Sequence, residues 1–131
     1  MQFNINNASE RAVYQQIIDQ VKLDIAMGRI LKDEKLPTVR QLAVQLAINP
    51  NTIAKAYRQL EQEGIIVTKS GAGAFIAETN NSLSKAVRKK LICQELDRII
   101  VDAVHMQIDK ETLAEWFGQQ LEKFKFADKK E

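Results

Sequence analysis

The chain has 131 residues, of which 45% are hydrophobic and 27% are charged, and its formal net charge is +2. This size suits one compact domain with a small appendage, and the lack of any apolar run near the roughly 20 residues of a membrane span excludes a membrane protein. One cysteine and one histidine exclude an internal disulfide framework and the usual structural zinc site, so we expect no metal or other cofactor. No signal peptide is visible, and a cytoplasmic location is expected.

The first periodic segment spans residues 11–27, where apolar side chains recur at three- and four-residue steps and predict an amphipathic helix. Ser9 is its expected N-cap, and Gly28 is its expected C-cap because glycine enters the left-handed region at no steric cost. A short punctuated segment then ends at Pro37, a residue suited to the first turn of a helix. Thr38 is expected to cap or open that second helix. Its apolar face is expected to consist of Leu42, Ala43 and Leu46.

A third helix is predicted to begin with Asn49 as N-cap and Pro50 as its first residue, and to end at Gly64. Its inward-facing residues are expected to be Ile53, Ala56, Tyr57 and Leu60. Two short helices about four residues apart match a helix-turn-helix. Residues 65–69 and 74–77, joined by a glycine turn, then predict a β-hairpin, which after such a pair of helices indicates a wing.

The predicted fold class is α+β, mainly α, with a winged helix-turn-helix DNA-binding domain over residues 1–78 and a two-helix dimerisation segment over 79–131. The segment is predicted as a long amphipathic helix from Leu83 to Ala103 and a final helix capped by Asp109. So small a unit cannot bury both apolar faces alone, so a homodimer is expected. The predicted dimerisation residues are Leu91, Leu96, Ile99, Ile100, Trp116 and Phe117.

Basic charge is concentrated in one stretch of a nearly neutral chain. Between residues 35 and 60 the charged side chains are Lys35, Arg40, Lys55 and Arg58, with no acid among them. A phosphate-binding surface requires basic side chains that are concentrated in one part of the protein. Short polar and basic side chains at the start of a helix can also read base edges in the major groove. The predicted DNA-binding residues are Thr38, Arg40, Asn49, Asn51, Thr52, Lys55, Tyr57, Lys69, Ser70 and Gly71.

Several residues of this region also have a purely structural interpretation. Arg40, Lys55 and Arg58 could be solvated surface cations, and the wing glycines could serve only the hairpin geometry. Tyr57 could pack against the core instead of binding phosphate, or do both. In the last segment, Cys93 is expected to be a buried helix residue and not a redox sensor.

Several ordered motifs together resemble a known family. They are Leu36-Pro37-Thr38-Val39-Arg40-Gln41-Leu42-Ala43, Asn51-Thr52-Ile53, Ala56-Tyr57, Leu60-Glu61, Glu63-Gly64 and Gly71-Ala72-Gly73-Ala74-Phe75-Ile76. Over roughly residues 10–78 they are similar to the GntR family of bacterial transcription regulators. The start of the third helix and the short C-terminal part resemble the YtrA subfamily. The resemblance implies a dimeric repressor of a transporter-type operon that binds a pseudo-palindromic operator in double-stranded DNA.

Two other function classes, an enzyme and a protein-interaction module, fit the sequence less well. An enzyme is not indicated, because no nucleophile with a base, metal cluster or phosphate loop is present in the sequence. A winged-helix module for protein interaction would present an apolar or acidic third helix, which Asn51, Thr52 and Lys55 contradict. Two helices can hardly enclose the roughly 300 Å³ that a drug-sized ligand needs, so no dedicated metabolite domain is expected. A small-molecule effector bound between domains or subunits stays open.

Overall fold

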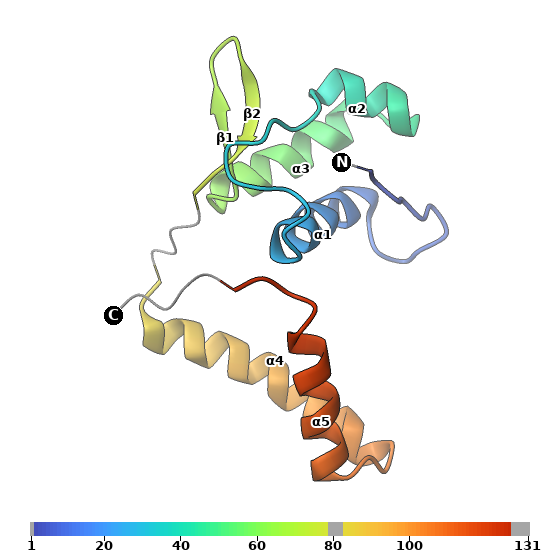
Figure 1. The fold of residues 1–131 in the computed structure, drawn as a ribbon. Helices are drawn as coiled ribbons and strands as arrows, with labels where there is room; N and C mark the ends of the chain where they lie inside the picture. The colour runs from blue at the N-terminus through green and yellow to red at the C-terminus, as the bar shows by residue number, and fades with distance from the viewer. Residues whose placement is uncertain (1, 79–82, 127–131) are drawn as a thin grey trace. The chain divides into compact units, whose positions relative to one another are not determined.

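The structure is a computed structural model that describes residues 2–78 and 83–126. Residues 2–78 belong to one compact unit and residues 83–125 to a second. The elements of the first unit are α1 (Val13–Ala26), α2 (Val39–Leu46), α3 (Pro50–Gln62), β1 (Ile66–Lys69) and β2 (Gly73–Ile76); those of the second are α4 (Lys85–His105) and α5 (Lys110–Leu121) (Figure 1). The predicted α+β fold class, mainly α, is confirmed. Within the described ranges, no helix is both long and apolar enough to traverse a bilayer.

The core of the first unit lies where α3 packs against both α1 and α2. The apolar stripes expected from the sequence supply it, with Ile17 and Val21 from α1 and Ile53 and Leu60 from α3 fully buried. Leu42 closes the core from α2. Because these stripes all face inward, the opposite faces of α2 and α3 are exposed; they are mostly polar or basic, apart from Val44 on α2, which is 79% exposed.

The helix ends follow the predicted caps with two corrections. Asn49 and Pro50 begin α3 as expected, and Gly28 follows α1 with a φ of 73°. However, α1 begins only at Val13 and has no side-chain cap, because the Ser9 hydroxyl accepts a hydrogen bond from the Arg11 amide in the preceding turn instead. Pro37 lies one residue before the cap of α2 and not in its first turn, since Thr38 is the N-cap.

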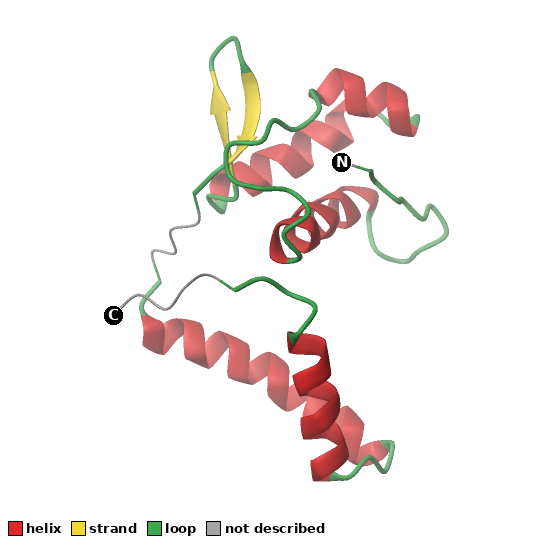
Figure 2. Cartoon of the chain, viewed as in Figure 1, coloured by secondary structure: helices red, strands yellow, loops and turns green. Residues whose placement is uncertain are grey.

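The hairpin is antiparallel, and its register pairs Ile66 with Ile76, Val67 with Phe75, and Lys69 with Gly73. A third segment joins it. The segment before α2, drawn as a loop in Figure 2, forms an isolated bridge between Lys35 and Phe75. From the residue pattern this segment was expected to be a connection only. The wing sheet is therefore broader than the two strands that the residue pattern predicts.

The second unit is a helical hairpin. The Ser84 hydroxyl caps α4, and Asp109 caps α5 by accepting a hydrogen bond of 2.9 Å from the Thr112 amide, as the sequence predicted. Hydrogen bonding from Thr112 holds the pKa of the Asp109 carboxyl below its ordinary value. Among the described residues of this unit only Ala103 is buried. Cys93 is exposed on α4, so the expectation that it is buried is wrong for the single chain, because α5 does not cover that side of α4.

Candidate nucleic-acid interface

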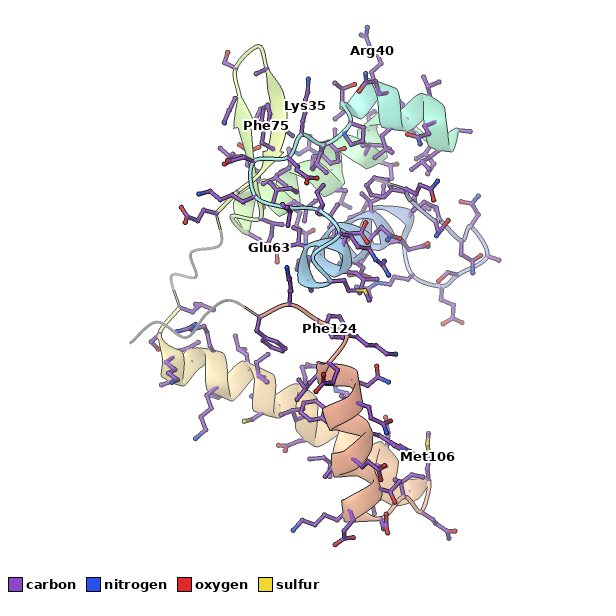
Figure 3. The ribbon with its side chains drawn as sticks, in the orientation of Figure 1. Lys35, Arg40, Glu63, Phe75, Met106 and Phe124 are labelled. Carbon is purple, nitrogen blue, oxygen red and sulfur yellow. The ribbon has the colours of Figure 1, made fainter. Side chains whose placement is uncertain are left out.

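The start of α2 is fixed by a reciprocal pair of hydrogen bonds. The Gln41 amide donates to the Thr38 hydroxyl, and the Thr38 amide donates to the Gln41 side-chain oxygen, both at 3.0 Å. This capping box holds Arg40 in the first turn of the helix. Arg40 is exposed and extends away from the unit (Figure 3). A guanidinium beside a helix N-terminus can bind phosphate oxygens in a bidentate manner.

The two asparagines at the start of α3 are held differently. The side-chain oxygen of Asn49 accepts a hydrogen bond of 2.9 Å from the Asn51 amide and so caps the helix. The Asn51 side chain is exposed, and Thr52 beside it is half-buried. Bidentate recognition of adenine needs both the oxygen and the amide nitrogen of one asparagine. Of the two, Asn51 is therefore the residue whose side-chain oxygen accepts no hydrogen bond from a described residue, as this recognition requires.

The exposed face of α3 changes the sign of its charge along the helix. Asn51, Lys55 and Arg58 follow one another at steps of four and three residues and are all exposed. The C-terminal end instead carries Glu61 and Glu63. A helix that enters the major groove with its first turns would bring its polar and basic residues to the bases and leave its acids outside.

Lys55 is held by a ring from another helix. Its ammonium nitrogen lies 3.9 Å from the centroid of the Tyr14 ring on α1. A cation over an aromatic face is attracted by the ring quadrupole, so Tyr14 restricts where the lysine side chain lies without neutralising its charge.

The wing tip is shaped by Gly71. This residue has a φ of 74°, and the Ala72 amide closes the turn by donating to the Lys69 carbonyl at 3.0 Å. A Cβ at residue 71 would meet no atom within 4 Å. In the free protein, glycine is thus required at residue 71 because of the positive φ, and not because a side chain would clash with a neighbour. This fits the interpretation that the wing glycines serve the hairpin geometry. Ser70 is exposed at the tip, and Lys69 lies over the Phe75 ring at 4.6 Å.

Tyr57 differs from the other predicted DNA-binding residues. It is only 7% exposed, and its hydroxyl donates a 2.6 Å hydrogen bond to the Pro37 carbonyl. Burial raises the pKa of this hydroxyl well above its ordinary value, so the group stays protonated. The hydroxyl hydrogen links α3 to Pro37, the residue before the cap of α2, and is not free for a phosphate. The packing alternative for Tyr57 therefore fits the geometry.

The basic residues of the first unit fall into two groups. Those away from the predicted DNA-binding elements are ion-paired: Arg11 with Asp19, Lys22 with Glu63, Arg29 with Asp24, and Lys32 with Glu78. Within residues 2–78, the cations on α2, α3 and the wing form no ion pair with a described acid: Lys35, Arg40, Lys55, Arg58 and Lys69. Within residues 2–78, the basic residues without an ion pair therefore lie on the elements that carry the predicted DNA-binding residues or on the segment that bridges to the wing.

Lys35 is a member of this second group that the predicted site omitted. In the sequence, Lys35 stands out only as part of the basic stretch between residues 35 and 60. The signal that could have identified it is the charged Lys35 directly before the apolar Leu36, because neighbouring side chains of a strand lie on opposite faces. Its bridge to Phe75 is what brings it to the wing.

The predicted dimerisation residues are spread along the helical hairpin of the second unit. Leu96, Ile99, Ile100 and Phe117 line an apolar groove of about 280 Å³ between α4 and α5. Leu91 and Trp116 are exposed and do not line this groove. Within the described residues, no group of three or more histidine, cysteine or acidic side chains could hold a metal ion.

Comparison with known proteins adds one family and several relatives. Residues 13–76, from the start of α1 to the end of β2, match the family described as bacterial regulatory proteins, gntR family. The chain is 38% identical over 115 residues to the HTH-type transcriptional repressor YtrA of Bacillus subtilis strain 168, and the match covers 88% of each chain.

Two solved structures are similar as well. One is described as a transcriptional antiterminator from Listeria monocytogenes EGD-e; it is 30% identical, has a TM-score of 0.75, and the match covers 100% of this chain and 98% of that one. The other is the DNA-binding domain of AraR in complex with the operator ORX1. It is 27% identical with a TM-score of 0.50, and the match covers 59% of this chain and 99% of that chain.

Proposed function

The chain belongs to the gntR family of bacterial regulatory proteins, whose members are transcription regulators and not enzymes, and from this premise we propose that it is a transcriptional repressor that binds operator DNA. The observation that carries the proposal is the division of the basic residues of the first unit. Within residues 2–78, cations outside the interface are paired with acids, whereas those on α2, α3 and the wing form no ion pair with a described acid. A surface that neutralises phosphates needs uncompensated charge of this kind.

In this proposal α3 enters the major groove with its first turns. Asn51, Thr52 and Lys55 reach base edges there, while Arg40 at the start of α2 binds the phosphate backbone. Lys69, Ser70 and Gly71 of the wing approach the neighbouring groove. The AraR complex supports binding of an operator, since a DNA-binding domain similar to part of this chain binds operator DNA there.

The regulator acts as a homodimer in this proposal. The helical hairpin of the second unit leaves large apolar side chains on α4 and α5 exposed, with Ile99 at 54% and Phe117 at 49%. A second copy related by a two-fold axis would cover them. Two DNA-binding units would then contact half-sites about one helical turn apart, which requires a pseudo-palindromic operator. The chain resembles the YtrA subfamily, and this resemblance suggests that its operator controls a transporter-type operon. The protein would act in the cytoplasm.

The proposal is tested by fluorescence anisotropy of the purified protein with DNA from upstream of its own gene and with a scrambled duplex, at several salt concentrations. We expect nanomolar binding to the upstream DNA, weaker binding to the scrambled duplex, and a steep loss of affinity with salt. Arg40→Ala should weaken binding to both duplexes and leave the melting temperature unchanged, because the side chain is exposed and forms no ion pair with a described acid.

Failure to bind either duplex at low salt would refute the proposal and support a protein-interaction role for the winged helix. If Arg40→Ala unfolds the protein, the assignment of this residue to the surface is wrong.

A further inference from the structure

The wing sheet has three hydrogen-bonded segments. The Asp33 amide donates to the Ile76 carbonyl, the Ile76 amide donates to the Glu34 carbonyl, and the Leu36 amide donates to the Ala74 carbonyl, each at 2.9 Å. These bonds continue the antiparallel ladder on the side of β2 that does not pair with β1. Lys35 therefore lies directly opposite Phe75 across this ladder.

The register assigns the side chains to two faces. Ile66, Ile76 and Leu36 are each at most 2% exposed and form the face that packs on the core. Side chains alternate along a strand, and residues directly opposite each other in an antiparallel pair share a face. The outer face of the wing therefore carries both Lys35, opposite Phe75, and Lys69, opposite Gly73.

The side chain of Lys35 runs across a glycine on that outer face. A Cβ on Gly73 would lie 3.0 Å from Cε of Lys35 and 3.7 Å from its ammonium nitrogen. Lys35 therefore uses the space that the missing side chain leaves. Lys69, which pairs with this same glycine, instead lies over the Phe75 ring at 4.6 Å. The two ammonium groups thus occupy one small area beside Phe75 and Gly73.

Nothing in the described chain neutralises this pair of charges. Both lysines are exposed, and within residues 2–78 and 83–126 neither forms an ion pair. Lys32, only three residues before Lys35, is by contrast paired with Glu78 at 3.4 Å. Figure 3 shows Lys35 and Arg40 extending toward the side on which the wing tip lies. Two like charges held close together bind most favourably an anion with several oxygens.

We propose that Lys35 and Lys69 form a clamp that binds one phosphate of the DNA backbone on the outer face of the wing sheet, with Gly73 leaving room for Lys35. This inference rests on the proposed DNA-binding function. It adds Lys35 to the interface and extends the wing contact from the tip to the face of the sheet. Because the ligand is a phosphate and not a base, the clamp contributes equally to binding of every DNA sequence.

The test compares Lys35→Gln, Lys69→Gln, the double variant and Lys32→Gln, each in the full chain. The probe is a random-sequence duplex of about 30 base pairs, long enough for two half-sites and independent of the unidentified operator. Affinity is measured by fluorescence anisotropy over a range of salt concentrations. Lys32→Gln is the matched control, because it removes the same charge from the same segment, and its lysine is already ion-paired.

We expect Lys35→Gln to reduce the slope of log affinity against log salt by about 0.9 for each half-site contacted. Lys32→Gln should leave the slope unchanged, and Lys35→Arg should retain it. The double variant should lose less affinity than the product of the two single losses, because both lysines hold the same phosphate.

If Lys35→Gln behaves like Lys32→Gln while the unaltered protein binds DNA, the clamp is refuted and the proposed function stands. Fully multiplicative losses in the double variant would mean that the lysines contact separate phosphates, which also refutes a shared clamp. Failure of the unaltered protein to bind the duplex at low salt would refute the proposed function together with the clamp.

Discussion

At the scale of single residues, the hydrogen bonds that a side chain already makes decide what it can still recognise. The Asn49 oxygen is occupied by the cap of α3, and the Tyr57 hydroxyl hydrogen is occupied by the Pro37 carbonyl. The side chain of Asn51 is exposed, and its oxygen accepts no hydrogen bond from a described residue. Residues of similar type and neighbouring position thus divide into those that build the helix-turn-helix and those that are free to contact a ligand.

This division predicts opposite effects for the two asparagines. Asn49→Ala should lower the free energy of unfolding by about 1 kcal/mol through loss of the cap, and Asn49→Asp should retain that stability. Asn51→Ala should leave stability unchanged and reduce discrimination between upstream and scrambled DNA by about 1–3 kcal/mol. Denaturant unfolding and anisotropy titrations measure the two quantities. Loss of discrimination by Asn49→Asp, with none by Asn51→Ala, would contradict the assignment.

At the scale of the elements, the turn of the helix-turn-helix contains a strained residue. Ala47 ends α2 in the left-handed region with φ 54° and ψ 47°, and the Ile48 amide then donates to the Ala43 carbonyl at 3.0 Å. Alanine occupies this region only at a cost, because its Cβ approaches the following carbonyl oxygen. The packing of α2 and α3 on a shared core holds the turn in place despite that cost.

Ala47→Gly should therefore raise the free energy of unfolding by about 0.5–1 kcal/mol, after allowance for the greater flexibility of unfolded glycine. Ala54→Gly, inside α3, should lower it by about 1 kcal/mol. Thermal or denaturant melts of the two variants give the comparison. Destabilisation by Ala47→Gly would contradict the argument that the left-handed conformation of Ala47 costs the folded protein stability.

The elements also show how far sequence alone could lead. The helical cores and the caps at Thr38, Asn49 and Asp109 were predictable, because they depend on side chains within one turn. The third segment of the wing was not, since its pairing with β2 joins residues some forty positions apart in the sequence. Lys35 was therefore absent from the predicted site. The burial of Tyr57 was predicted, but its hydrogen bond to Pro37 depends on how α3 packs.

At the scale of the whole molecule, the two units differ in how fully they bury their apolar side chains. The first unit has a closed core contributed by three helices and the wing. In the described part of the second, only Ala103 is buried, although α4 and α5 carry many large apolar residues. A two-helix hairpin has too much surface for its volume to be stable alone in this state. A second copy on this surface would resolve the imbalance.

The dimer proposal predicts that Ile100→Lys, in the groove between α4 and α5, converts dimers to monomers in sedimentation experiments. Loss of the second half-site contact should then lower affinity for upstream DNA by about a hundredfold or more. Asp102→Lys places the same residue on the opposite side of α4 and should stay dimeric. Circular dichroism confirms that each variant retains its helices. If folded Ile100→Lys remains a dimer, the interface lies elsewhere.

The ion pairs of the first unit have a kinetic consequence. Because acids neutralise the cations away from the interface, the remaining positive charge gives this unit an electric dipole, even though the chain is close to neutral overall. In the field of a polyanion such a dipole turns the approaching protein before contact is made. The association rate should thus fall with salt. Breaking the ion pair between Lys22 and Glu63 would change the direction of this dipole, and with it the orientation in which the protein approaches DNA. No residue of the proposed DNA contact would be altered.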